Sequence, residues 1–252
     1  MLLGVLTRGE ATWSEDLMLP LDRGDGSKEA YFTFAYSPIT DESKGVGGVF
    51  CAVVETTERV IQERRLRLLN ALADTTQAKT PGEACALAAA QIARSPSDVP
   101  FALLYVLDRA ARVAQLAGSA HVEPGSPLSP AEIPFGHSSP WPFDEAASKD
   151  GATLVALDAG PHGTSAAVVL PIARSGSGRR FGFIVVGLSP MLRKDASYDR
   201  FHNLLSAGIS QAVNNAAATK RRGDGPTRSL SSIGRRPRFS AMSATSFGRR
   251  SR

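Results

Sequence analysis

The chain has 252 residues, of which 42% are apolar and 21% charged, a composition typical of a globular protein with one large domain or two small ones. Its two cysteines provide neither a disulfide framework nor a metal-binding spacing, and no apolar run approaches the ~20 residues of a membrane span. The net charge of +5 is uneven, because residues 219–252 hold ten Lys/Arg and one acidic residue. We therefore expect a cytoplasmic protein that has no membrane segment and ends in a basic tail.

The first part of the chain predicts an antiparallel sheet. The segment EAYFTFAYS (29–37) alternates as a strand does, and VFCAVVE (49–55) follows after the turn-forming residues 38–48. The segment ATWSEDLMLPL, which begins at residue 11, predicts a third strand. These segments indicate a β-hairpin with one further strand.

The hydrophobic period changes to that of a helix over 57–77. Thr57 provides an N-cap, Ile61 and Leu72 belong to an apolar stripe, and Arg65 is predicted to lie elsewhere around the axis. This helix could pair with a copy of itself or pack on its own domain, and the sequence leaves both open.

A second helix follows in KTPGEACALAAAQIARS. Thr80 and Glu83 have the spacing of a capping box, and Pro81 falls at the first helical position.

The remaining elements alternate between hairpins and helices. Strands are predicted at 101–108 and 112–120, a loop at 121–140, a short helix and a strand at 141–158, and two more strands at 164–173 and 180–190. A helix over 197–217 closes the pattern. The expected fold class is α+β, an antiparallel sheet with flanking helices.

This order and these residues resemble a GAF domain. The resemblance is carried by PFALLYVLD, SAAVVLPIARSGSGRRFGFIVVGLSP and YDRFHNLLSAGISQAVNNA, and it covers about residues 66–218. It implies a sensor module of the kind found in bacterial histidine kinases, with 80–218 as the GAF-like domain and 57–79 as a signalling helix.

The segment YFTFAYSPITDESKGVGGVFCAVVETTERV is similar to the last hairpin of a PAS domain. Residues 1–56 are therefore expected to be the C-terminal half of a PAS-like domain. In such kinases the last GAF helix continues into a dimerisation helix that carries the phosphoacceptor histidine. The sequence contains no such segment, so we expect the kinase region to be absent.

The tail 219–252 has two interpretations. Suitable synonymous codons for the family's phosphoacceptor segment, Ser-Asn-Val-Ser-His-Glu-Phe-Arg-Thr-Pro-Leu-Thr, give SAMSATSFGRRSR (240–252) in another reading frame. The tail could thus be a frameshifted dimerisation helix, or a basic, disordered segment that binds nucleic acid.

No residue pattern predicts catalysis. The four histidines lack a metal-binding spacing, and His202 is expected to be solvated or to cap its helix. No catalytic residue, metal or cofactor is predicted, and the chain as it stands is not expected to be an enzyme.

A ligand pocket, if present, would lie between the sheet and the loop 121–163, and any ligand remains unidentified. Its candidate lining residues are Tyr105, Phe135, Trp141, Phe143, Val169 and Phe183.

The favoured hypothesis is a non-catalytic sensory and dimerisation module of a two-component phosphorelay protein, a truncated PAS-GAF sensor histidine kinase. We expect a homodimer through helices 57–77 and 197–217, without nucleic acid or membrane as a partner. The alternative is a free-standing GAF regulator whose basic tail binds nucleic acid.

Overall fold

The computed structural model describes residues 1–223 apart from 23, 25, 74–76, 150 and 177–178. Its first elements are α1 (Leu2–Arg8), β1 (Thr12–Met18), β2 (Leu21–Asp22), β3 (Ser27–Lys28), β4 (Tyr31–Thr40), β5 (Val46–Glu55), α2 (Thr57–Ala73) and α3 (Pro81–Ile92). They are followed by β6 (Ala102–Asp108), β7 (Val113–Ala120), β8 (Glu132–Pro134), α4 (Phe143–Ser148), β9 (Thr153–Ala156), a 3₁₀ turn (Pro161–Gly163), β10 (Ala166–Ala173), β11 (Arg180–Gly187) and α5 (Ala196–Gly223).

A six-stranded antiparallel sheet forms the centre of the core domain, which we define as residues 57–223. Its strand order is β8-β7-β6-β11-β10-β9. The predicted strands at 101–120 and 164–190 therefore lie in one sheet, as expected, and β6 and β11 are its two central strands. Most residues of both central strands are buried, which explains their nearly continuous apolar sequences.

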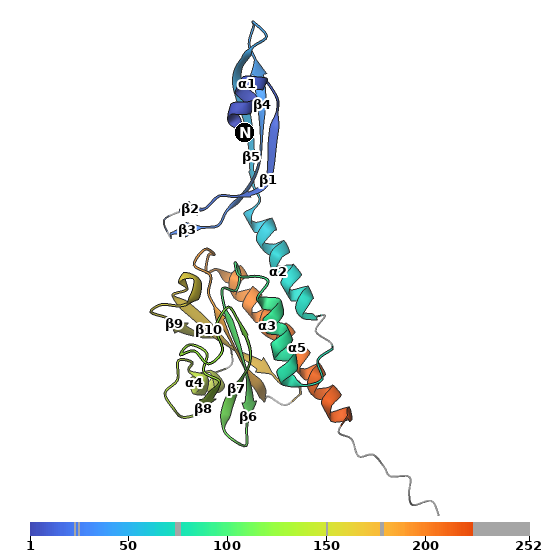
Figure 1. Ribbon diagram of the computed structural model, residues 1–252, viewed down its shortest axis with the longest axis vertical. Helices are drawn as coiled ribbons and strands as arrows, with labels where there is room; N and C mark the ends of the chain where they lie inside the picture. Colours follow the sequence, from blue (N-terminus) through green and yellow to red (C-terminus); the bar gives the residue numbers. More distant parts are fainter. Residues whose placement is uncertain (23, 25, 74–76, 150, 177–178, 224–252) are drawn as a thin grey trace, which may run out of the picture.

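Helices cover the sheet on one face. The helices α3 and α5 pack against it, and α2 packs against α5, so that Leu104, Ile184 and Leu205 meet in one apolar core (Figure 1). On the other face α4 and the loops around β8 enclose a second, aromatic core. The α+β class is confirmed.

The predicted capping box begins α3. The Thr80 side chain accepts a hydrogen bond from Glu83 N at 3.2 Å, and Glu83 Oε2 accepts one from Lys79 N at 2.8 Å. Pro81 occupies the first turn, where its missing N–H costs nothing.

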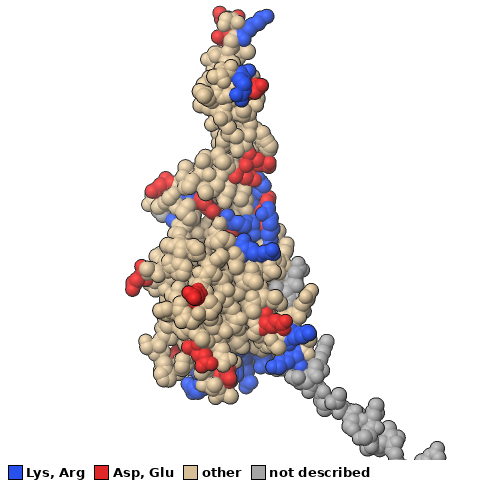
Figure 2. Space-filling view, in the orientation of Figure 1, with Lys and Arg blue, Asp and Glu red and all other residues tan. Residues whose placement is uncertain are grey.

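The N-terminal sheet, which we define as β1, β4 and β5, has the order β1-β4-β5 and stands at the start of α2, away from the core domain (Figure 1). Its surface is mostly uncharged between a charged tip and a charged base (Figure 2). Large apolar side chains are exposed on it, which is typical of a surface that contacts another protein segment. They include Trp13, Leu17, Ile39, Phe50, Val53 and Val54.

Four expectations need correction. The helix α1 and the short strand β8 were not predicted: α1 is only seven residues long, and β8 lies inside the predicted loop 121–140. The last helix runs to Gly223, so residues 219–223 are helical and not part of a disordered tail. His202 is not solvated but buried, with 4% of its surface exposed.

The rest of the predicted tail, 224–252, lies outside the described residues. Of the helices that the structure does describe, none combines the length and the apolar composition needed to cross a bilayer.

Candidate functional site

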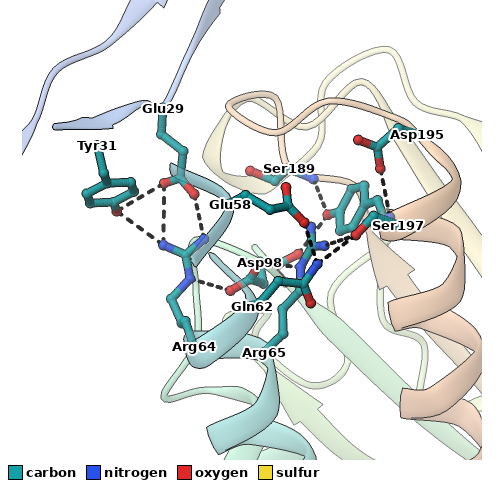
Figure 3. Close-up of polar contacts among 11 residues, drawn as sticks. Glu29, Tyr31, Glu58, Gln62, Arg64, Arg65, Asp98, Ser189, Asp195 and Ser197 are labelled. Carbon is teal, nitrogen blue, oxygen red and sulfur yellow. Dashed lines mark hydrogen bonds and ion pairs between the residues drawn. The ribbon is translucent and has the colours of Figure 1, made fainter. Parts of the chain in front are cut away.

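The junction between the N-terminal sheet and the core domain is a network of buried charges (Figure 3). We define the junction by Glu29, Tyr31, Arg64, Arg65, Asp98, Ser197 and Tyr198. Arg64 and Arg65 are consecutive residues of α2, and both pair with Asp98, which lies in the segment before β6. Arg65 Nε is 3.1 Å from Asp98 Oδ1, and Arg64 Nε bonds the other carboxylate oxygen.

Arg64 connects this pair to the N-terminal sheet. Its Nη2 atom lies 2.5 Å from Glu29 Oε1, and its Nη1 donates to Tyr31 Oη at 3.3 Å. Burial disfavours the charge of Arg64, but hydrogen bonds to Asp98 and Glu29 outweigh this effect and raise its pKa. Two guanidinium groups thus face two carboxylates, which compensates the cost of burying charge.

The junction also contacts the start of α5. Arg65 lies over the rings of Tyr198 and Phe201, 5.0 and 5.1 Å from their centroids, and donates to Ser197 Oγ at 3.3 Å. Tyr198 Oη donates to the backbone oxygen of Asp98 at 2.7 Å. Asp98 therefore contacts α2 through its side chain and α5 through its backbone.

Two backbone contacts reinforce the connection. Lys28 Nζ donates to Pro190 O at 3.0 Å, and Glu29 N donates to Met191 O at 2.9 Å. The segment from β3 to the start of β4 therefore touches the loop that leads into α5. A cleft of about 380 Å³ lies between this loop, the start of α2 and residues 28–30.

The sequence analysis missed this site, although one signal was present. Arg65 falls on the apolar stripe of α2 with Ile61, Leu68 and Leu72, and all four are buried. The prediction that Arg65 lies off the stripe was wrong. A charge at a stripe position indicates a buried partner, but nothing in the sequence identifies Asp98 as that partner.

His202 lies next to the junction on α5. Its ring centroid is 4.2 Å from that of Tyr198, and its Nε2 has no hydrogen-bond partner among the described residues. Burial, with a smaller contribution from the charge of Arg65, lowers the pKa of His202 to about 4. The folded state therefore holds this imidazole neutral.

This gives a pH prediction. In the unfolded chain His202 binds a proton below its ordinary pKa of about 6.5, whereas in the folded chain it does so only near 4. Its contribution to stability is thus complete above pH 6.5 and is lost as the pH falls to 4, by up to about 3 kcal/mol. We expect His202→Phe to lose less stability than the wild type between pH 7 and 4.5 in urea unfolding. The exposed His137→Gln serves as the control, and equal losses in wild type and His202→Phe would contradict this assignment.

On the other face of the core sheet, the predicted pocket residues come together. Five are buried in one aromatic core and Phe135 packs partly buried beside them. Phe143 stacks on Phe183 at 4.8 Å between centroids and meets the edge of Tyr105 at 5.2 Å. The other two buried members are Trp141 and Val169.

These rings pack against one another, and two polar atoms among them are satisfied by loop carbonyls. Trp141 Nε1 donates to Leu128 O at 2.8 Å, and Tyr105 Oη donates to Pro130 O at 3.0 Å. Two of the six predicted residues, Phe135 and Phe183, also line an open cavity, which we call the turn pocket. That all six residues line a single ligand site remains a prediction.

The described residues contain no group of three or more His, Cys, Asp or Glu side chains that could hold a metal ion. Two loop histidines do touch: the rings of His121 and His162 meet edge to face at 5.6 Å. The His121 ring also bonds Ala93 O at 3.0 Å, so this contact joins loops around the core sheet.

No family model matches the sequence, and no curated protein matches it. Among solved structures the chain is similar to the GAF domain of an Acinetobacter phosphoenolpyruvate-protein phosphotransferase, at 14% identity and a TM-score of 0.46 over 61% of this chain and 95% of that one. It is also similar to a putative GAF sensor protein from Burkholderia vietnamiensis, at 16% identity and a TM-score of 0.47 over 62% and 92%.

A third similar structure is the free methionine-R-sulfoxide reductase of Neisseria meningitidis in complex with its substrate. It is 18% identical, with a TM-score of 0.44 over 66% of this chain and 92% of that one. At these identities and TM-scores the three similarities concern the fold, and they extend to no ligand and no activity.

Proposed function

We propose that this chain is a non-catalytic sensory module of the GAF type, from a two-component signalling protein, in which α2 and α5 carry a signal to a catalytic domain. The N-terminal sheet, a PAS-like half-domain in this proposal, acts on α2. The observation that carries the proposal is the position of Asp98, which bonds Arg64 and Arg65 of α2 and the first turn of α5. A change in the angle of α2 must break or move these contacts, and so reaches α5.

The relay can be tested in a chimera. Residues 1–217 are joined, in continuous helical register, to the dimerisation helix and catalytic core of a histidine kinase. Autophosphorylation is then measured for the wild type, Arg64→Gln and the matched control Glu63→Gln. Glu63 is exposed and pairs only with Arg59 and Arg67 among the residues described, so it lies outside the junction.

We expect Arg64→Gln to change the rate of autophosphorylation at least about threefold and Glu63→Gln to leave it unchanged. The chain without the added core serves as the blank, on which we expect no phosphate. Equal rates in all three chimeras would contradict the relay.

The proposed module is a homodimer. On α2 and α5, Leu66 and Leu204 are the large apolar side chains that face solvent, with 57% and 50% of their surfaces exposed. Both lie on the helices that pack together in the core domain, so a second copy that covers them would align the two helix pairs.

We expect Leu66→Glu to shift the chain from dimer to monomer in light scattering, because the substitution places a charge in the helix interface. Glu63→Gln again provides the control. A wild-type chain that is monomeric at 100 μM, or a Leu66→Glu variant that remains dimeric, would contradict this arrangement.

A further inference from the structure

The turn pocket lies on the α4 face of the core sheet, at the end of β6 and the starts of β7 and β11. Its volume is about 470 Å³, within the range of small-molecule sites. Phe135, Phe183, Leu107 and Ala147 provide an apolar surface. Its charged lining residues are Asp108, Arg109, Arg112, Arg179 and Arg180.

The charges at this pocket are strongly unbalanced. Four arginines face one acidic residue, and Asp108 Oδ1 already accepts hydrogen bonds from the backbone of Ala110 and Ala111, at 3.0 and 3.1 Å. In the described part of the chain, Arg109, Arg112 and Arg179 form no ion pair. The pocket therefore combines an apolar surface with three arginines, Arg109, Arg112 and Arg179, that have no anionic partner among the described residues.

Two of the arginines are held in place by neutral carbonyls. Arg180 donates to Ala147 O and Lys149 O at 2.8 Å each, which ties the end of α4 to β11. Arg109 donates to Arg180 O at 3.0 Å. The bond of Arg109 positions its guanidinium group through a neutral carbonyl, so an incoming anion would meet a preorganised donor.

We infer that the turn pocket binds a small organic anion, a carboxylate or phosphate attached to an aromatic or similarly apolar body. The anionic group pairs with Arg109 and Arg112, and the apolar body lies against Phe135 and Phe183. An inorganic anion would leave the apolar surface unused, and a neutral aromatic compound would leave the arginines unpaired.

The turn pocket is connected to the junction through the two central strands of the core sheet. The strand β6 begins shortly after Asp98 and ends beside Arg109 at the pocket. The strand β11 begins at Arg180 and leads back towards Ser189, whose N–H donates to Tyr198 Oη at 2.9 Å. The two central strands thus connect the turn pocket with the junction, and the pocket would supply the proposed sensory module with an input.

The binding test uses the whole chain and two probes, 1-naphthoate and 1-naphthyl phosphate, followed by backbone NMR shifts. We expect at least one probe to bind with millimolar or tighter affinity and to shift residues 107–112, 135, 147 and 179–183. Inorganic phosphate and the neutral 1-naphthalenemethanol should bind at least tenfold more weakly. If neither probe shifts these residues, or inorganic phosphate produces the same shifts at the same affinity, the inference is wrong.

The double variant Arg109→Gln/Arg112→Gln should weaken binding of the probe at least tenfold. Lys194→Gln/Arg200→Gln removes the same charge from exposed positions and should leave the affinity within twofold. An equal loss of probe affinity in both double variants would indicate general charge attraction, and the proposed binding site would be wrong. Binding that leaves α5 unaffected would refute the relay but not the pocket, so the two proposals can fail separately.

Discussion

Asp98→Asn should be the most destabilising single change at the junction, at about 3–5 kcal/mol. It would leave the buried Arg65 and the partly buried Arg64 with Glu29 as the one remaining carboxylate of the junction. Asn keeps the size of the side chain, so the loss isolates the charge. The same change should also weaken the packing of Arg65 on the first turn of α5, because Arg65 lies over the ring of Tyr198 and would lose its ion pair with Asp98. Urea unfolding followed by near-ultraviolet circular dichroism would measure both effects.

The matched control is Glu63→Gln on the same helix. Its ion pairs are exposed and of the i,i+4 type, so its removal should cost well under 1 kcal/mol. Arg65→Gln combined with Asp98→Asn should cost less than the sum of the two single changes, because each single change already breaks the pair. If Asp98→Asn unfolds at the urea concentration of the wild type, Asp98 is not the centre of the junction.

Gly182→Ala should cost about 3 kcal/mol or more, through the core sheet itself. A Cβ on Gly182 would lie 1.8 Å from the backbone oxygen of Tyr105, and backbone cannot move aside as a flexible side chain can. Gly182 pairs with Val106 across β6 and β11, so the clash would force the two central strands apart. The turn pocket, which adjoins Phe183, should lose its shape as well.

Gly208→Ala provides the opposite case in the same chain. Its Cβ would meet only Leu72 Cβ at 4.0 Å, an ordinary contact, and alanine favours a helix over glycine by about 1 kcal/mol. We therefore expect Gly208→Ala to raise the melting temperature and Gly182→Ala to lower it. A neutral Gly182→Ala would mean that β6 and β11 do not approach each other as described.

The strands and helices of the core domain could be predicted because their sequences are long and periodic. The apolar runs at 101–108 and 164–173 are the signature of buried strands, and the capping box at Thr80 fixes the start of α3. The strand β8 could not be predicted, since three residues in a proline-rich loop carry no period and pair only because β7 lies beside them.

The junction was beyond sequence analysis for a different reason. Asp98 lies in a short connection and looks like any solvated loop carboxylate, and Glu29 is 35 positions away from Arg64. Their meeting depends on how the N-terminal sheet and α5 dock on α2, which is tertiary information. The six pocket candidates were placed on the correct face, because aromatic residues of β6, β11 and the loop must share one core. How many of these six side chains face a cavity depends on how they pack against one another, which the hydrophobic pattern of the sequence does not determine.

The central claim is that the junction couples the N-terminal sheet to α5, and hydrogen exchange in Glu29→Gln tests it most directly. Glu29 lies outside the core domain; its carboxylate bonds Arg64, which bonds Asp98, and the backbone oxygen of Asp98 accepts a hydrogen bond from Tyr198 of α5. We expect amides of 196–205 to exchange at least about fivefold faster in Glu29→Gln than in the wild type, and at the wild-type rate in Glu63→Gln. If faster exchange is confined to residues 27–31 and 57–66, the two ends of the molecule are not coupled in this way.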